Sequence, residues 1–178
     1  PFPPEALPVV FTGAMDYLPN VDAATWFAAD VLPGLVQRWP AVRFYVVGRS
    51  PAPEVLALAS DRIVVTGTVD DVRPYLQYAA AVVAPLRIAR GIQNKVLEAM
   101  AMSRPVIASA ACAAAVDAVA GQELLTATSP EEYVAAISQA LEAPETGTAL
   151  GRAARQRVVA RYTWEAHMKV IDPYLPAP

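Results

Sequence analysis

One stretch of the chain combines, at the start of an expected helix, side chains that could bind an anion. It runs from Arg87 to Met102 and combines a short polar loop around Gly91 with three cations and one carboxylate, Glu98. An apolar run ending at Pro85 precedes the loop and strong helix formers follow it, so we expect a strand, a loop and a helix start in that order. In an open α/β sheet, ligands bind at such a place because free N–H groups and the positive end of the helix dipole meet there.

The spacing within this stretch predicts which side chains of the expected helix are buried and which face the loop. At about 100° per residue, Asn94, Lys95 and Glu98 share one side of the expected helix with Met102. The aliphatic side chains fall on the other side: Val96, Leu97 and Met100. We therefore expect this aliphatic side to be buried, while Lys95 and Glu98 face whatever lies above the loop.

Length and composition indicate one compact α/β domain. The chain has 178 residues, of which 55% are hydrophobic and 17% charged, and its formal net charge is −3. This is enough chain for one core, and a net negative charge disfavours nucleic acid as a partner. No apolar run is long enough to span a bilayer, and the N-terminus has no signal pattern. We therefore expect cytoplasmic residence, and leave open a peripheral association with the inner face of the membrane.

Cysteine and histidine are too scarce to build a metal centre. The chain holds one cysteine, Cys112, and one histidine, His167. A lone cysteine excludes an internal disulfide, and the pair leaves no set of ligands for zinc. We therefore expect no metal.

Strands and helices alternate along the chain. Short β-branched or aromatic runs predict six strands, at residues 9–12, 42–47, 63–66, 81–85, 105–109 and 124–127. Between and after them, helices are expected at 21–38, 53–60, about 70–78, 94–102, 130–141, 148–161 and from 164. This order predicts a doubly wound parallel sheet of about six strands with right-handed crossovers, a Rossmann-like fold.

Local signals define several ends of these elements. Asn20 is the expected N-cap of the first helix, and Pro33 is expected to kink or divide it. Ser129 and Glu132 form a capping box with Pro130 between them. The proline-rich residues 1–8 predict an interdomain linker ahead of a domain at 9–178, and the lack of an initiating methionine suggests a piece of a larger protein.

Several nucleotide-binding patterns are absent from the sequence. Gly13 stands alone after the first strand, where a dinucleotide fingerprint would need G-x-G-x-x-G, and neither a Walker motif nor a G-x-S-x-G elbow occurs. What remains is a set of strands that end at Gly13, Gly48 and Gly67, on the same sheet edge as the loop 87–95. A nucleoside diphosphate there would meet free amides and cations, and Glu98 could accept two hydrogen bonds from a ribose diol.

These pieces in this order resemble the C-terminal, donor-binding domain of GT-B glycosyltransferases of the retaining, group 1 type. The matching segments are Phe11–Gly13 with Pro19–Asn20, Val46–Gly48, Val65–Val69, Ala84–Leu86, Leu97–Ala101 with Arg104–Ser109, and Tyr162–Trp164. Within that group, the segment from Arg90 to Glu98 resembles a subset of bacterial sugar transferases linked to exopolysaccharide and exosortase (protein-sorting) loci.

The resemblance implies transfer of a hexose from a nucleotide-diphosphate sugar with retention, without cofactor or metal. Glu98 matches the second glutamate of the family's E-x7-E motif, which binds the donor ribose. The first glutamate, which usually contacts the donor sugar, falls at Arg90, and this departure reverses the charge. We therefore assign Arg90 and Lys95 as the catalytic cations that hold the diphosphate. The donor-binding set comprises Gly13, Arg49, Gly67, Val69, Arg87, Gly91, Gln93, Asn94 and Glu98.

A second departure concerns the charge that stabilises the leaving phosphate. The family's usual Arg and Lys after the first strand are missing from residues 13–20, where Asp16 stands. Lys95 or Arg87, with Arg49, would have to supply that charge. The resemblance also places the acceptor site, for a sugar or a lipid-linked sugar, in an N-terminal domain outside this chain, so the chain alone should bind nucleotide weakly and transfer nothing.

Two other functions stay open at this point. One is a sugar-nucleotide epimerase of the GT-B fold, which the altered position 90 permits. The other is a non-catalytic module that binds nucleotide or only a partner domain. The sequence does not define the base, the sugar, the acceptor or the oligomeric state.

Overall fold

Six parallel strands form one sheet in the computed structural model, which describes residues 1–168 apart from the side chains of Pro144 and His167. The strands are β1 (Leu7–Thr12), β2 (Val42–Val47), β3 (Ile63–Gly67), β4 (Ala81–Ala84), β5 (Val106–Ala108) and β6 (Leu125–Thr126), in the spatial order β3-β2-β1-β4-β5-β6. The prediction of a Rossmann-like sheet of six parallel strands is confirmed. β1 starts at Leu7, ahead of the predicted residue 9, because residues 7 to 12 pair in register with residues 42 to 47 of β2.

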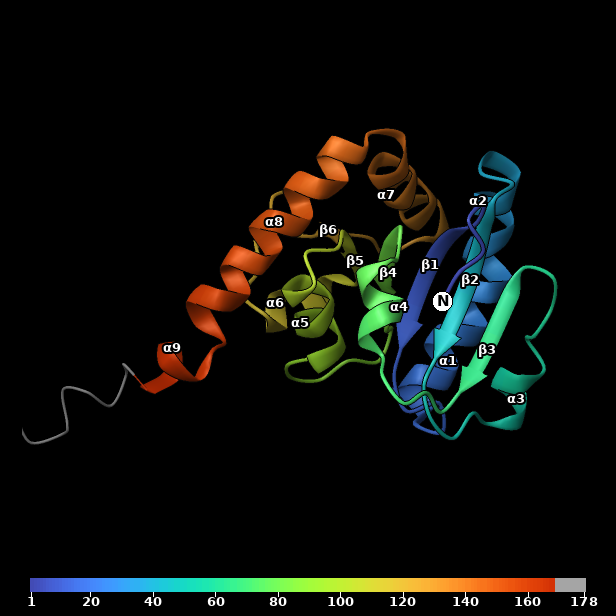
Figure 1. Cartoon of the computed structure of the whole chain (residues 1–178). Helices are drawn as coiled ribbons and strands as arrows, with labels where there is room; N and C mark the ends of the chain where they lie inside the picture. The colour runs from blue at the N-terminus through green and yellow to red at the C-terminus, as the bar shows by residue number, and fades with distance from the viewer. Residues whose placement is uncertain (169–178) are drawn as a thin grey trace, which may run out of the picture.

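Helices follow most of the strands, as the alternation predicts (Figure 1). Their bounds are α1 (Leu18–Trp26), η1 (a π-helical segment, Phe27–Val31), α2 (Leu32–Arg38), α3 (Pro53–Leu56), α4 (Arg73–Gln77), α5 (Asn94–Ala101), α6 (Ala110–Ala115), α7 (Pro130–Glu142), α8 (Pro144–Arg161) and α9 (Trp164–Met168). Residues 169–178 of the predicted domain lie outside the described part of the chain.

The sheet is buried between two layers of helices. Successive residues of β2 point to opposite layers: Phe44 packs against Phe27 of η1 with ring centres 4.5 Å apart, whereas Tyr45 packs against Phe2 at 4.5 Å. Phe2 in turn contacts Tyr75 of α4 at 5.7 Å, so the proline-rich lead-in lies against the sheet. Figure 1 shows α1 and α2 behind the sheet and α4 and α5 in front of it. Burial on both faces explains why the strands are continuous apolar runs.

The helix predicted at 21–38 is divided, as expected for Pro33. Pro33 is the second residue of α2 and cannot donate a backbone hydrogen bond to the preceding turn, and the π-helical η1 takes up the change. The predicted capping role of Asn20 is wrong. α1 begins at Leu18 with Pro19 in its first turn and Tyr17 as N-cap, so Asn20 lies inside the helix and is buried.

Other helix ends differ from the prediction by part of a turn to a full turn. α3 stops at Leu56 instead of residue 60, and α8 starts at Pro144 instead of residue 148. α4 starts at Arg73, whose backbone N–H donates to Asp71 at 2.9 Å. The capping box of Ser129 and Glu132 is confirmed at the start of α7.

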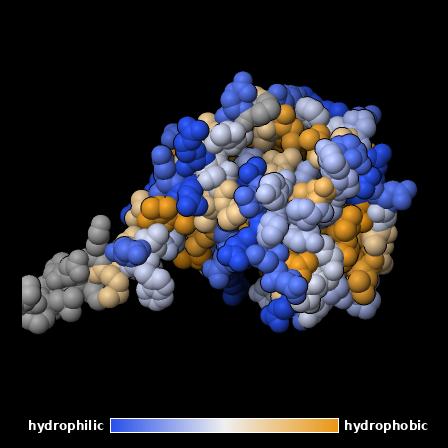
Figure 2. Space-filling view, in the orientation of Figure 1, coloured by the Kyte–Doolittle hydropathy of each residue, from blue (hydrophilic) through white to orange (hydrophobic). Residues whose placement is uncertain are grey.

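The outer surface is mostly hydrophilic in the view of Figure 2. Hydrophobic residues form separate small areas there, one of them over the edge strand β3. Among residues 1–168, no helix combines the length and the apolar character needed to cross a membrane.

Candidate functional site

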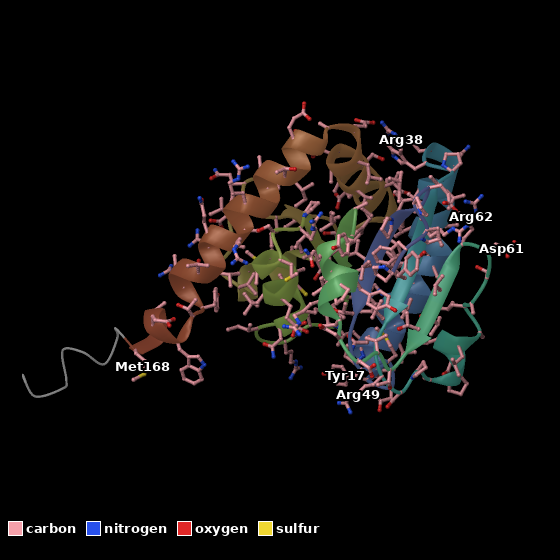
Figure 3. The ribbon with its side chains drawn as sticks, viewed as in Figure 1. Tyr17, Arg38, Arg49, Asp61, Arg62 and Met168 are labelled. Carbon is pink, nitrogen blue, oxygen red and sulfur yellow. The ribbon has the colours of Figure 1, made fainter. Side chains whose placement is uncertain are left out.

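A cavity of about 530 Å³ opens where β1, β2 and β3 end. The chain runs from β1 to β2 and β3 on one side and then crosses to β4 on the other side of β1, so this edge is the topological switch point of the sheet. Figure 3 shows Tyr17 and Arg49 at this edge and Arg38 and Arg62 at the opposite end of the molecule. The cavity is lined by Thr12, Gly13, Ala14, Tyr17, Asn20, Val47, Gly48, Arg49, Thr68, Val69, Val72, Ile92, Gln93, Asn94, Lys95 and Glu98.

Most of the predicted site residues meet in this wall, and four do not. Those in the wall are Gly13, Arg49, Val69, Gln93, Asn94, Lys95 and Glu98. Gly67 and Gly91 lie beside it in loops and adopt positive φ angles of 67° and 65°. Arg90 is exposed in the loop before α5 and Arg87 lies elsewhere, so neither lines the cavity.

Arg87 is held by α1 instead of facing the cavity. Its Nε donates to Asp22 Oδ2 at 3.0 Å and its Nη2 donates to Asp22 Oδ1. Its guanidinium also lies over the ring of Trp26, 5.6 Å from the ring centre. Of the two cations that the sequence offered for the leaving phosphate, the structure therefore places only Lys95 in the cavity wall, together with Arg49.

Lys95 points its ammonium into the cavity floor. Nζ donates to Asn20 Oδ1 and lies 4.5 Å from the centre of the Phe11 ring. Burial lowers the pKa of Lys95 to about 8, and the neighbouring Cys112 and Glu98 partly oppose that shift. The ammonium is therefore charged at neutral pH, and no described carboxylate lies within ion-pair distance of it.

Asn20 is a site residue that the sequence reasoning missed. It is 5% exposed, its Nδ2 donates to the Ala14 carbonyl at 2.8 Å, and its Oδ1 accepts from Lys95. A signal for it exists in the sequence: Asn20 shares the helical spacing of Ala23, Ala24 and Phe27, which are all buried. A polar residue on an apolar helix stripe needs a partner.

Two glycines allow the loops of the cavity floor to approach each other closely. A Cβ at Gly48, where φ is 153°, would lie 1.7 Å from the Gly13 carbonyl oxygen. A Cβ at Gly13 would lie 2.6 Å from Asn20 Nδ2 and 2.9 Å from Lys95 Nζ. Any side chain at Gly13 would therefore displace both polar groups above it.

Two kinds of hydrogen-bonding group in the wall, the Glu98 carboxylate and the first amides of α5, remain free for a ligand, whereas the unpaired Thr12 hydroxyl is buried. Glu98 is exposed one turn after Lys95, and its carboxylate makes no hydrogen bond or ion pair with a described side chain. Thr12, a second residue that the sequence reasoning missed, is 4% exposed and its hydroxyl has no partner among the described residues. At the start of α5, the Gln93 side chain donates to the Arg90 carbonyl at 3.1 Å instead of capping the helix. The first N–H groups of α5 can therefore meet an anion.

The cavity thus combines cations, helix-start amides and one unpaired carboxylate. This set can hold a polyanion beside a diol, because ammonium and guanidinium groups donate to phosphate and a carboxylate accepts from hydroxyls. Among the side chains that the structure describes, no three His, Cys, Asp or Glu are grouped closely enough to hold a metal ion.

Comparison with protein families gives one match that covers most of the chain. The family described as glycosyl transferases group 1 matches residues 7–143. The comparison with curated proteins gave no match.

Two solved structures with the same fold are bacterial proteins in complex with UDP. A variant of Staphylococcus aureus TarM, in complex with fondaparinux, α-GlcNAc-glycerol and UDP, superposes with a TM-score of 0.77 at 17% identity over 93% of this chain and 34% of that one. Anabaena HepE, in complex with UDP and glucose, gives 0.77 at 14% identity over 96% of this chain and 48% of that one.

A third structure is itself a single domain. The C-terminal domain of the group 1 family protein LpcC from Francisella tularensis gives a TM-score of 0.71 at 16% identity, over 89% of this chain and 88% of that one. The chain therefore spans a third to a half of TarM and HepE, and nearly all of the LpcC domain. At these identities the likeness concerns the fold.

Proposed function

Because the chain belongs to the group 1 glycosyl transferases, we propose that its cavity binds the nucleotide diphosphate of a sugar donor. The observation that carries the proposal is the placing of Lys95 and Glu98 one turn apart on α5, in one cavity at the switch point of the sheet. Residues three apart on a helix are neighbours, so a cation and a carboxylate face adjoining parts of one ligand. That arrangement fits a phosphate next to a ribose.

The diphosphate lies at the start of α5 in this proposal. Lys95 and the free amides of α5 hold its charge, Arg49 reaches it from the loop after β2, and Glu98 accepts hydrogen bonds from the ribose hydroxyls. As the sugar leaves, negative charge grows on the departing diphosphate. Lys95 and these amides already point there and stabilise that charge without reorganising, so the step needs no metal ion.

The finer parts of the proposal rest on the sequence resemblance. We propose transfer of a hexose with retention, to a sugar or lipid-linked acceptor held by an N-terminal domain, in the cytoplasm and in the service of exopolysaccharide synthesis. UDP in the TarM and HepE structures supports a uridine nucleotide as the first ligand to test. The chain spans a third to a half of those proteins, so alone it should bind the nucleotide and transfer nothing.

Calorimetric titration with UDP and GDP tests the site directly. The wild-type chain should bind one of them with a dissociation constant of millimolar or below. Glu98→Ala should weaken this by about fivefold or more, because two hydrogen bonds to the ribose are lost. Glu145→Ala, an exposed glutamate at the start of α8, is the matched control and should bind as the wild type does. No binding, or equal binding by Glu98→Ala, would contradict the proposal.

A further inference from the structure

The Asn20 side chain can take only one orientation between its two partners. The Ala14 carbonyl can only accept a hydrogen bond and the Lys95 ammonium can only donate. The amide nitrogen must therefore face Ala14, and the amide oxygen must face Lys95. Because Asn20 is 5% exposed inside α1, this orientation is fixed by the fold.

Asn20 in turn limits where Lys95 can point. Of the three N–H groups on the ammonium, one is taken by Asn20 Oδ1. The Phe11 ring lies on another side of the ammonium, with its centre 4.5 Å from Nζ. Because Gly13 has no side chain, the Asn20 and Lys95 side chains have space to meet there. The remaining donor capacity faces the cavity, whose wall both residues share.

The chemical nature of the partner matters as much as its position. An aspartate has nearly the same shape as an asparagine, but at position 20 it would pair with the ammonium and cancel its charge. The titratable groups that face Lys95 are Glu98 on its own helix and Cys112 of α6, and neither is bonded to it. A neutral amide therefore holds the ammonium without forming an ion pair with it, so its positive charge remains for a ligand.

We propose that Asn20 is a positioning residue for diphosphate recognition, which fixes the Lys95 ammonium at the cavity floor without neutralising it. This inference rests on the proposed function, since it assigns the free charge of Lys95 to the diphosphate of the donor. It also assigns part of the recognition of the diphosphate to Asn20 of α1, and not only to the polar loop and the helix α5 that carry Lys95.

The test compares UDP with uridine, which lacks the diphosphate. At pH 7.5, Asn20→Asp should lose about tenfold or more in affinity for UDP, the scale of one charge-assisted contact, while its affinity for uridine stays within about twofold of the wild type. Asn20→Ala keeps the charge of Lys95 but not its position, so it should lose about threefold for UDP only. Gln37→Glu, the same change of charge at an exposed position of α2, is the control and should alter neither affinity.

A pH series gives a readout that a merely structural role would not move. UDP is fully ionised above neutral pH, because the last phosphate pKa is about 6. Wild-type affinity for UDP should therefore fall as Lys95 loses its proton above a pKa of about 8. In Asn20→Asp the added carboxylate favours the charged lysine, so this fall should begin about one pH unit higher or more.

The outcomes separate the two proposals. If the wild type binds UDP more tightly than uridine and both Asn20 variants keep that ratio and the same pH profile, the role of Asn20 is overturned and the donor site stands. If the wild type binds neither UDP nor GDP, the proposed function itself is overturned. Asn20→Ala removes no charge partner, so it keeps the test valid should Asn20→Asp fail to fold.

Discussion

Replacing Lys95 by methionine should stabilise the fold at neutral pH while it removes the ammonium charge from the cavity. Methionine keeps the unbranched length of lysine and suits a site beside Phe11 and Cys112. The cost that it relieves is the burial of an ammonium, which lowers the pKa of Lys95 from 10.5 to about 8.

The size of the effect follows from proton linkage. Each unit between the folded and unfolded pKa is worth about 1.4 kcal/mol, so a charged Lys95 costs the fold about 3 kcal/mol at pH 7. The variant regains this but leaves Asn20 Oδ1 without its donor, a loss of about 1 kcal/mol. The net expectation is a gain of about 2 kcal/mol in the free energy of unfolding at pH 7.

The sign of the pH dependence provides the sharper part of this test. Between pH 8 and 10.5 the unfolded chain keeps a proton on Lys95 that the folded chain has released, so wild-type stability should rise with pH in that window. From pH 7 to 9.5, deprotonation of Lys95 should raise the free energy of unfolding of the wild type by about 2 kcal/mol. Below pH 7 both states are protonated and the cost is constant.

Urea unfolding of both proteins at pH 7 and 9.5 measures these quantities. Titrating groups that do not interact with Lys95 are present in both proteins and cancel in the difference. The Cys112 thiol does not cancel, because burial raises its pKa and the charge of Lys95 lowers it, so both proteins carry Cys112→Ala in this assay. The variant's advantage should shrink by about 2 kcal/mol between the two pH values. A less stable variant at pH 7, or a difference between the proteins that does not change with pH, would refute the reasoning.

Three further expectations concern the loops of the site. Gly48→Ala should lower the free energy of unfolding by about 2 kcal/mol or more, because its Cβ would lie 1.7 Å from a carbonyl oxygen. Gly67 has a φ of 67° and open space around it, so Gly67→Ala should cost about 1 kcal/mol in the same urea assay. Arg49→Ala should weaken UDP binding by about threefold to tenfold and Arg87→Ala by less than about twofold, since only Arg49 lines the cavity; equal losses in calorimetry would contradict this. Arg90→Glu should change the affinity for UDP-sugars relative to one another more than the affinity for UDP, and an equal loss for UDP and a UDP-sugar would speak against a sugar-facing position 90.

The sheet and several helix ends could be predicted because their signals are local. The apolar runs that define six strands need no knowledge of their neighbours, and the Ser129 capping box closes within one turn. Pro33 divides the first helix for an equally local reason, since its missing N–H removes a hydrogen bond of that helix.

The directions of Asn20 and Arg87 could not be predicted, because each depends on a partner distant in sequence. Asn20 suits an N-cap and a buried polar contact equally well, and its contact with Lys95 spans 75 positions. Arg87 looks as suitable for a phosphate as Lys95 does, but Asp22, 65 positions away, holds it outside the cavity. The residue types indicate which hydrogen bonds these side chains can make. Where the side chains point is decided by the packing of α1 against the segment that carries Arg87 and Lys95.

Nitrogen–proton correlation spectra of the isotopically labelled chain test the central claim most directly, because they show which amide resonances shift when UDP binds. Binding at the switch point should shift the amides of Gly13, Gly48, Thr68 and Asn94, which line the cavity at the carboxyl ends of the strands and at the start of α5. Gly147 of α8, which lies near the amino ends of β1 and β5 at the opposite edge of the sheet, should not move. Shifts confined to that opposite edge, or no shifts at millimolar UDP and GDP, would contradict the account.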